Sequence, residues 1–288
     1  MPGRRTLLTA GTATAAALLT SAPAHAATDR LRALERRHGA RLGVFAYNVR
    51  TGRSVTHRAD ERFPMCSPFK TLAVGAVLRD LDRHGEVLSR RIHYTRADLV
   101  DGAPVTGTEE HLAHGMTVAE LCDAAIRYSD NSAANLLLRL LGGPTAITRF
   151  ARSLGDRVTR LDRWEPDLNS AEPGRRTDTT SPRAIGGSYA RLVLGHALNG
   201  PDRARLTRWL LTNTTGDHRI RAGLPATWTV GDKTGSGSYG TTNDVAVTWT
   251  PDGAPVVLAA LSTKPRQDAA WDDSLLAGAA AVVAAALG

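Results

Sequence analysis

The order in which strand-like and helix-like segments follow one another constrains this 288-residue chain most. Two strands are predicted near the N-terminus, joined at the hairpin signal Thr51-Gly52, and three near the C-terminus, with Pro251-Asp252-Gly253 as a turn. The segments between them have helical apolar spacing. The sequence therefore predicts an α/β (α+β) fold, with an antiparallel sheet built from both termini and an inserted all-helical domain. The predicted strands are residues 42–49, 54–58, 228–233, 244–250 and 256–263.

Helix signals accompany the apolar spacing. Thr117-Val118-Ala119-Glu120 is a capping box, and glycines follow the ends of several helices. The Ala-rich C-terminal segment resembles a membrane span in hydropathy, but Asp272 and Asp273 near its start favour a helix packed on the sheet. Residues 155–182 have little periodicity, which is typical of a long functional loop. The predicted helices are residues 29–38, 69–82, 117–128, 131–141, 182–198, 202–211 and 269–287.

The N-terminal residues have the pattern of a processing segment. Arg4-Arg5 precedes an Ala/Leu/Thr stretch that is too weak for a membrane anchor, and Ala24-His25-Ala26 is a small-x-small cleavage site. Residues 1–26 are therefore predicted to be a signal peptide, of the twin-arginine rather than the Sec type, that exports a bacterial protein. The remainder is predicted to divide into a discontinuous sheet domain and a helical domain. The sheet domain comprises residues 27–64 with 212–288, and the helical domain comprises residues 65–211, which include the 160–179 loop.

Basic residues outnumber acidic ones by 36 to 28, and the sequence pI is near 10.1. The arginines are scattered among acids, which indicates a solvated surface rather than a nucleic-acid partner. Only three basic residues are lysines, Lys70, Lys233 and Lys264, and the last is expected at the surface without a role. Cys66 and Cys122 are expected in separate helical stretches as buried, unbridged small hydrophobes.

The first chemical motif is Ser67-Pro68-Phe69-Lys70. A spacing of three places Ser67 and Lys70 on one helical face, and proline suits the first turn of a helix. A serine hydroxyl becomes a nucleophile when a nearby base takes its proton; a neutral lysine could do this, whereas an arginine stays protonated. The alternative is a capped helix with a surface lysine, but Phe69 and Leu72 favour a buried helix.

Three further motifs could complete a site. Ser129-Asp130-Asn131 could shuttle a proton and bind a substrate amide, with Asp130 bracing the loop, although an N-cap cluster alone explains it better. Lys233-Thr234-Gly235 could hold a carboxylate, or could be an edge-strand lysine at the end of a strand before a turn. Glu165 and Asn169 could jointly hold a water for general-base attack, although without context a solvated loop acid is the better explanation.

Together and in this order, the four motifs resemble those of the class A serine β-lactamases. The resemblance covers residues 28–287 and includes the long stretches 115–118, 129–137 and 158–166. It implies a two-lobed β-lactamase/transpeptidase-like fold. It also implies a monomeric serine hydrolase without cofactor or metal, whose partner is a small-molecule β-lactam and which has neither a nucleic-acid partner nor a membrane anchor.

The resemblance implies a role for each matching residue. Ser67 would be the nucleophile, activated by Lys70 directly or together with Glu165, and Ser129 would pass the proton to the leaving nitrogen. Glu165 and Asn169 would position the deacylating water. Asn131 would bind the acylamide of the substrate. Its carboxylate would be bound by Lys233, Thr234 and Ser236, beside Gly235. The backbone N–H groups of Ser67 and Ser236 would form an oxyanion hole. Asp130 would be structural, and Arg163 and Asp178 match the ion pair that closes the loop around Glu165.

The sequence also departs from the family pattern. No arginine follows the Lys-Thr-Gly motif on the next strand, but residues 214–219 resemble a subgroup of the family in which the cation comes from this segment. We therefore assign the second carboxylate-binding cation to Arg219, with Arg221 as the rival. Gly102 stands where many relatives carry an aromatic residue at the mouth of the site. Cys66 is present, but Gly237 occupies the position of its usual partner in carbapenem-hydrolysing relatives, so broad carbapenem activity is not expected.

The resulting hypothesis is a secreted β-lactamase that hydrolyses penicillins and cephalosporins through a Ser67 acyl-enzyme, deacylated by water that Glu165 activates. A penicillin-binding D-alanyl-D-alanine carboxypeptidase is the alternative, against which Glu165 with Asn169 argues. A non-enzymatic basic binding protein is a second alternative. The dinucleotide-like run at residues 235–240 precedes a strand rather than a helix, and His111 and His114 lack further ligands at zinc spacing.

Overall fold

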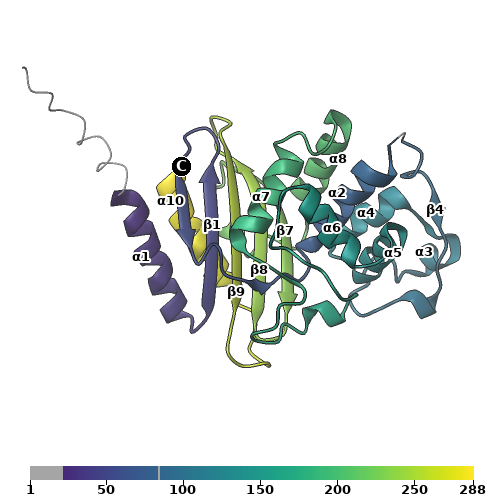
Figure 1. Cartoon of the computed structure of the whole chain (residues 1–288), viewed down its shortest axis with the longest axis horizontal. Helices are drawn as coiled ribbons and strands as arrows, with labels where there is room; N and C mark the ends of the chain where they lie inside the picture. Colours follow the sequence, from purple (N-terminus) through teal and green to yellow (C-terminus); the bar gives the residue numbers. More distant parts are fainter. Residues whose placement is uncertain (1–21, 84) are drawn as a thin grey trace, which may run out of the picture.

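A five-stranded antiparallel sheet forms the centre of the molecule (Figure 1). The computed structural model describes residues 22–83 and 85–288. The strand order is β2-β1-β9-β8-β7, so the N-terminal hairpin pairs with the last strand of the chain, as predicted. The strands are β1 (Arg41–Asn48), β2 (Ser54–His57), β7 (Thr229–Gly237), β8 (Thr241–Trp249) and β9 (Pro255–Thr263).

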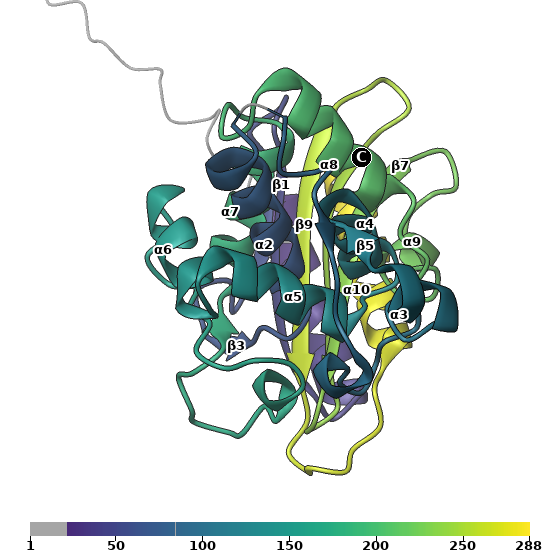
Figure 2. The same cartoon turned by 90° about the vertical axis from the view of Figure 1, so that its right-hand side faces the viewer.

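Helices cover both faces of this sheet (Figures 1 and 2). Leu42, Val44 and Leu258 face one core, which they share with α1 and α10, whereas Val245 and Leu261 face the opposite core beneath α7. Since successive side chains of a strand point to opposite faces, β8 and β9 are buried along almost their whole length. The three helices are α1 (Ala22–Arg37), α7 (Pro182–Val193) and α10 (Asp273–Leu287).

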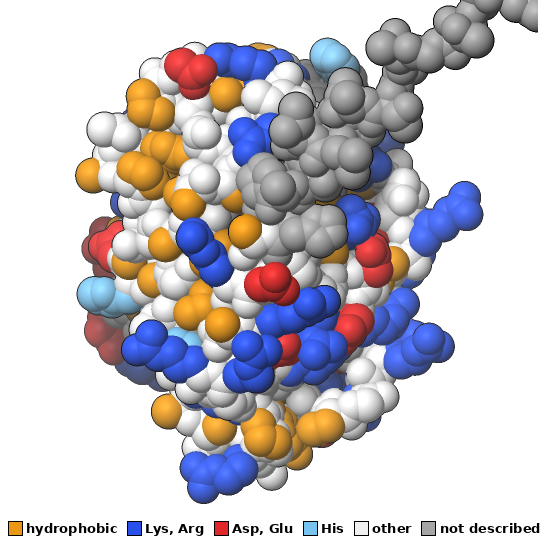
Figure 3. Space-filling model, turned by 90° about the vertical axis from the view of Figure 1, so that its left-hand side faces the viewer, with side chains coloured by type: hydrophobic (Ala, Val, Ile, Leu, Met, Phe, Trp, Pro, Cys, Tyr) orange, Lys and Arg blue, Asp and Glu red, His pale blue; other side chains and the backbone are white. Residues whose placement is uncertain are grey.

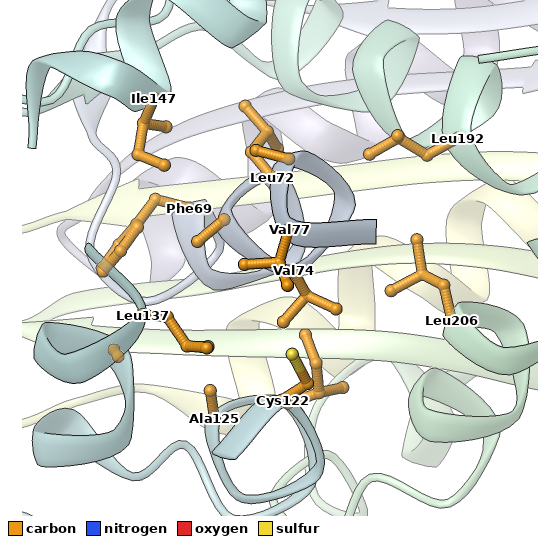
Figure 4. Close-up of a cluster of buried hydrophobic side chains, with 14 of the residues drawn as sticks. Phe69, Leu72, Val74, Val77, Cys122, Ala125, Leu137, Ile147, Leu192 and Leu206 are labelled. Atoms are coloured by element: carbon orange, nitrogen blue, oxygen red, sulfur yellow. The ribbon is translucent and has the colours of Figure 1, made fainter. Parts of the chain in front are cut away.

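The helical part of the molecule is centred on α2 (Phe69–Ala76). All eight of its residues are buried, which is typical of a helix surrounded by other helices. Figure 4 shows Phe69, Leu72 and Val74 of this helix among side chains that include Cys122 and Leu137. The packed neighbours are α4 (Val118–Arg127), α5 (Asn131–Leu141), α6 (Thr145–Ser153), α7 and α8 (Gly200–Leu211), and the π-helix η1 (Val77–Leu81) continues α2.

Several predicted boundaries were wrong. The helix predicted at 182–198 ends at Val193, and α10 begins only at Asp273 because the Asp272 side chain caps it by accepting from Leu275 N at 3.1 Å. The Lys-Thr-Gly motif lies inside β7 rather than at its end. Besides α6, the sequence missed α3 (Glu109–His114), α9 (Ile220–Gly223), the 3-10 helices η2 (Arg96–Asp98) and η3 (Asp167–Asn169), and the two-residue strands β3 (Phe63–Pro64), β4 (Arg91–Ile92), β5 (Met116–Thr117) and β6 (Thr179–Thr180).

Of the predictions for single residues, that of two free, buried cysteines was confirmed and that for Lys264 was wrong. Cys66 and Cys122 are free and buried, as predicted, but Cys66 precedes α2 instead of lying in a helix. Lys264 was wrongly predicted to be an idle surface residue. Its Nζ lies 2.9 Å from Asp272 Oδ2, and Asp272 also contacts His38. This pairing explains why Lys264 is only 20% exposed.

The signal-peptide prediction falls largely on residues 1–21, which lie outside the described residues, and α1 is described from Ala22, ahead of the predicted cleavage site. Within the described ranges, no helix is long and apolar enough to cross a membrane. Basic and acidic side chains lie among one another on the face that carries α1 (Figure 3), as the scattered arginines predicted. The division into two domains stays a prediction.

Candidate active site

Ser67 lies where the start of α2 meets strand β7. The backbone turns at Cys66, whose φ is 50°, and Lys70 N donates to Ser67 O at 2.9 Å in the first turn. A Cβ at Gly235 would stand 2.3 Å from Pro68 Cδ and 3.0 Å from Ser67 N, so only glycine lets β7 pass this close. Ser67 therefore lies at the boundary between the helical part and the sheet.

The Lys70 ammonium group is the hub of the buried polar network. It donates to Ser129 O at 2.8 Å and to Asn131 Oδ1 at 2.6 Å, and lies 3.1 Å from Glu165 Oε1 and 3.4 Å from Ser129 Oγ. The Lys70 side chain is fully buried, so these four oxygen atoms replace the water that a buried charge would otherwise lose. The buried helix predicted from Phe69 and Leu72 is confirmed, and the alternative of a capped helix with a surface lysine is excluded.

Ser129 joins both active-site lysines. Its Oγ accepts from Lys233 Nζ at 2.9 Å and lies within reach of Lys70, and its φ of 56° turns the backbone carbonyl toward Lys70. Burial, and next the charge of Lys70, lowers the pKa of Lys233 well below its ordinary value. Both cations thus converge on one hydroxyl group that could relay a proton.

Asp130 serves the loop rather than the network. Its carboxylate caps α5 by accepting from Ala133 N at 2.8 Å and also accepts from the backbone N–H groups of Val105 and Thr106 at 3.0 and 2.9 Å. The N-cap explanation and the bracing explanation therefore both hold for this residue.

Glu165 is presented by the long loop and held by two asparagines. Asn135 brackets its backbone, accepting from Glu165 N at 3.0 Å and donating to Glu165 O at 2.9 Å. Asn169 Nδ2 donates to Glu165 Oε2 at 2.5 Å, while Glu165 Oε1 faces Lys70. Asn169 Oδ1 is buried without a hydrogen-bond partner among the described residues. A carboxylate and an open amide oxygen side by side can together hold a water molecule.

The predicted ion pair of the loop is present. Arg163 Nε lies 2.6 Å from Asp178 Oδ2, and Asp178 Oδ1 accepts from the backbone N–H groups of Asp162 and Arg163 at 2.7 and 3.0 Å. Arg163 also donates to Ser170 Oγ at 2.8 Å. These bonds tie both ends of the loop together around Glu165.

Arg219, and not Arg221, contacts Gly235 and Ser236 at the end of the Lys-Thr-Gly motif. Its Nη1 donates to Gly235 O at 2.8 Å, and its Nη2 donates to Ser236 Oγ at 2.8 Å. Arg221 instead lies 2.6 Å from the buried carboxylate of Asp232. The geometry therefore supports the choice of Arg219 over its rival. Thr234 Oγ1 is 2.5 Å from Thr215 Oγ1, which fixes the hydroxyl next to Lys233.

Sequence reasoning missed the residues that hold the site residues in position. Asn135 lies within the resembling stretch 129–137, but its role was not predicted because its partner Glu165 is thirty residues away, and no role was predicted for Asn213, Thr215 or Asp232. Burial raises the pKa of Asp232 in β7 and of Asp244 in β8. In the part of the chain that the structure describes, no three His, Cys, Asp or Glu side chains are grouped to hold a metal ion.

Comparisons with known proteins agree with this geometry. The chain matches the model of the β-lactamase enzyme family over residues 26–286. The β-lactamase of Streptomyces albus G is 62% identical, with 100% of this chain and 98% of the relative covered, and that of Streptomyces fradiae is 61% identical, with 99% and 97% covered. The chain belongs to the class A serine β-lactamases.

Solved structures of the family have the same fold. The structure of the β-lactamase from Streptomyces albus G superimposes with a TM-score of 0.90 at 66% identity, over 91% of this chain and 100% of that one. The β-lactamase structure from Desulfarculus baarsii gives 0.90 at 52% identity, over 92% and 98%. The predicted two-lobed fold with helices and an antiparallel sheet is thereby confirmed.

Two departures of this β-lactamase from the family pattern can be located. A Cβ at Gly102 would lie 2.7 Å from Asn131 Nδ2, so the glycine leaves the amide of Asn131 uncrowded at the mouth of the site. A Cβ at Gly237 would lie 2.9 Å from Cys66 Sγ. Gly237 is thus the neighbour of Cys66, and Cys66 is free because glycine offers it no thiol.

Proposed function

We propose that this β-lactamase hydrolyses the β-lactam amide of penicillins and cephalosporins through an acyl-enzyme on Ser67. The observation that carries the proposal is the Lys70 ammonium group, which joins Ser129 and Glu165 within one buried network next to Ser67. The groups needed to form an acyl-enzyme and to hydrolyse it therefore share one site.

Acylation begins when Ser67 Oγ attacks the β-lactam carbonyl carbon and gives its proton either to Lys70, once Lys70 has passed a proton to Glu165 and become a neutral amine, or to the Glu165 carboxylate. The backbone N–H groups of Ser67 and Ser236 hold the developing oxyanion, at about 3 kcal/mol for each donor. The carbon–nitrogen bond of the ring breaks, and Ser129 Oγ gives its proton to the leaving nitrogen while it takes a proton from Lys70. Lys233, 2.9 Å from Ser129 Oγ, and Lys70 stabilise the hydroxyl group that relays this proton.

Deacylation uses the opposite side of the network. Glu165, with Asn169, takes a proton from a water molecule that attacks the ester carbonyl, and Ser67 recovers its proton as the opened product leaves. The open amide oxygen of Asn169 beside the Glu165 carboxylate supports this assignment. Arg163 with Asp178 positions the loop that carries both residues.

Substrate binding falls to the β7 strand and to Asn131. Lys233, Thr234 and Arg219 bind the substrate carboxylate, Ser236 and Gly235 line that strand, and the Asn131 amide binds the acylamide side chain. Arg219 supports this role through its 2.8 Å contact with Ser236 Oγ. A carboxylate held by three donors is oriented as well as attracted, which favours the attack geometry at Ser67.

The proposal extends to the form of the working protein. Export through a twin-arginine signal at residues 1–26 would release a secreted monomer. Because its cysteines form no disulfide, the chain needs no oxidation to fold, and it can fold either inside or outside the cell.

The test is turnover. We expect the purified protein to hydrolyse benzylpenicillin and a chromogenic cephalosporin for many cycles, and we expect Ser67→Ala to abolish this. A protein that instead stays acylated by penicillin for hours would be a carboxypeptidase. Salt-sensitive retention on DNA without turnover would favour the basic binding protein.

A further inference from the structure

A cavity of about 700 Å³ opens beneath residues 171–176, separate from the network around Lys70. Its walls come from the start of β1, from β3 and β6, and from the end of β9. The residues used below are Arg62, Phe63, Pro64, Pro173, Arg176 and Pro265. None of the residues to which we assign a catalytic or substrate-binding role lines this cavity.

The charges around the cavity are unbalanced. Five cations and two carboxylates line it. Three of the cations have carboxylate partners: Arg41 with Glu61 at 2.7 Å, Arg175 with Glu172 at 2.8 Å, and Lys264 with Asp272 at 2.9 Å. Arg62 and Arg176 have no carboxylate within 4.0 Å among the described residues. The cavity therefore presents two uncompensated guanidinium groups.

Arg62 is held in place but keeps free donors. Its Nη1 donates to Val158 O at 2.8 Å and to Thr179 Oγ1 at 3.2 Å, and its Nε and Nη2 have no partner in the described ranges. Burial, and then repulsion from Arg176 and other arginines, lowers the pKa of Arg62. A partly buried, pre-positioned guanidinium beside a second one forms a fork for an anion.

The rest of the wall is apolar. Pro64, Pro173 and Pro265 supply its accessible apolar surface, because the Phe63 ring is fully buried beneath the Arg41 guanidinium, which lies 3.9 Å from the ring centroid. An inorganic ion would contact the two guanidinium groups but leave this surface uncovered. A ligand with a ring would cover it, since apolar area removed from water stabilises binding.

We propose that this cavity is a binding site for a small amphiphilic anion, with an aromatic or aliphatic body against Pro64, Pro173 and Pro265 and an acidic group on Arg62 and Arg176. The site would also act on the 160–179 loop. Thr179 Oγ1 donates to Arg176 O at 2.6 Å and accepts from Arg62, so a bound anion ties the loop to β3. Binding itself does not depend on the proposed catalytic function.

The test is calorimetric titration of the full chain with phenyl phosphate, with inorganic phosphate and benzyl alcohol as fragments. Loss of one charge-assisted contact should weaken phenyl phosphate binding at least about ten-fold in Arg176→Gln, and further in Arg62→Gln/Arg176→Gln. Arg176 is exposed and its side chain has no described partner, so the single variant should fold normally. Each fragment alone should bind at least about ten-fold more weakly than phenyl phosphate.

Two matched variants locate the binding. Arg205→Gln/Arg208→Gln removes two charges at another surface depression and should leave the affinity unchanged. Lys233→Ala should also leave it unchanged. Loss of binding in Lys233→Ala but not in Arg176→Gln would assign the anion to the catalytic cleft and overturn the inference. If inorganic phosphate bound as tightly as phenyl phosphate, the apolar body would contribute nothing, which would overturn the proposal of an amphiphilic ligand. If Arg205→Gln/Arg208→Gln lost as much affinity as Arg176→Gln, the binding would be non-specific charge attraction, which would also overturn it.

Discussion

Arg219 and Arg221 lie two residues apart and each binds a carboxylate, yet we expect only the loss of the Arg219 charge to lower catalysis strongly. The Arg219 partner, Asp273, has a side chain that is 42% exposed, whereas the Arg221 partner, Asp232, is fully buried. The perturbation is the pair of single substitutions Arg219→Gln and Arg221→Gln, which remove the charge and leave a shorter side chain that still carries a hydrogen-bond donor.

Arg219→Gln should act on catalysis. The ion pair with half-exposed Asp273 contributes about 1 kcal/mol at most, and the buried carbonyl oxygens of Gly235 and Asn243 lose their donor at about 1–3 kcal/mol, so Tm should fall by about 2–16 °C as well. A charge-assisted hydrogen bond to the substrate carboxylate contributes about 1.5–3 kcal/mol, which corresponds to a loss of roughly 10- to 150-fold in kcat/KM.

Arg221→Gln should act on stability. It leaves the buried Asp232 carboxylate without its cation, which costs about 3–5 kcal/mol in comparable sites. Asn213 Nδ2 still donates to Asp232 at 2.7 Å, so we expect the lower end, about 3 kcal/mol. Tm should fall by about 6–12 °C, while the folded fraction retains most of its kcat/KM.

Both quantities are measured on the same two preparations, Tm by circular dichroism and kcat/KM by spectrophotometric penicillin hydrolysis. The two arginines serve as controls for each other, because the charge change is identical. An Arg219→Gln protein with normal kcat/KM would refute the role of Arg219 in binding the substrate carboxylate. A thermally unaffected Arg221→Gln protein would refute the assumption that buried Asp232 depends on its cation.

Two further predictions concern groups that the sequence did not reveal. Asn135→Leu leaves the backbone N–H and C=O of Glu165 unpaired, so we expect a loss of about 2–4 kcal/mol in urea unfolding, and deacylation slowed more than acylation in burst kinetics. Equal slowing of both steps would contradict a positioning role. Burial, then Asp232, raises the pKa of Asp244 well above 3.8, so the folded state keeps a proton that the unfolded chain has lost. The free energy of unfolding should therefore fall as the pH rises from about 4 through the raised pKa, and Asp244→Asn should flatten this slope; an unchanged slope would count against it.

The predictable part of the site was the part encoded by short spacings. Ser67 and Lys70 share one turn, and the capping box at Thr117 and Glu120 forms both of its bonds. The order of strands and helices likewise predicted the sheet, because side chains repeat every two residues along a strand and every 3.6 residues along a helix. Lysine identity was informative too, since Lys70 and Lys233 converge on Ser129.

The rest depended on contacts between distant segments. Asn135 and Glu165 are thirty residues apart, and their mutual hydrogen bonds exist only because α5 packs against the loop. The choice between Arg219 and Arg221 depended on the short helix α9, which turns the two side chains in different directions. Lys264 was misjudged because Asp272 reaches it from the start of α10. Local patterns carry no information on such pairings.

The central claim is that Glu165 deacylates an ester formed on Ser67. Intact-protein mass spectrometry of Glu165→Ala, mixed with benzylpenicillin and sampled over minutes, tests it most directly. We expect Glu165→Ala to gain the mass of one penicillin molecule and to keep it on the peptide that contains Ser67, while the unaltered protein returns to its free mass. Prompt release by Glu165→Ala, or no adduct at Ser67, would contradict the account.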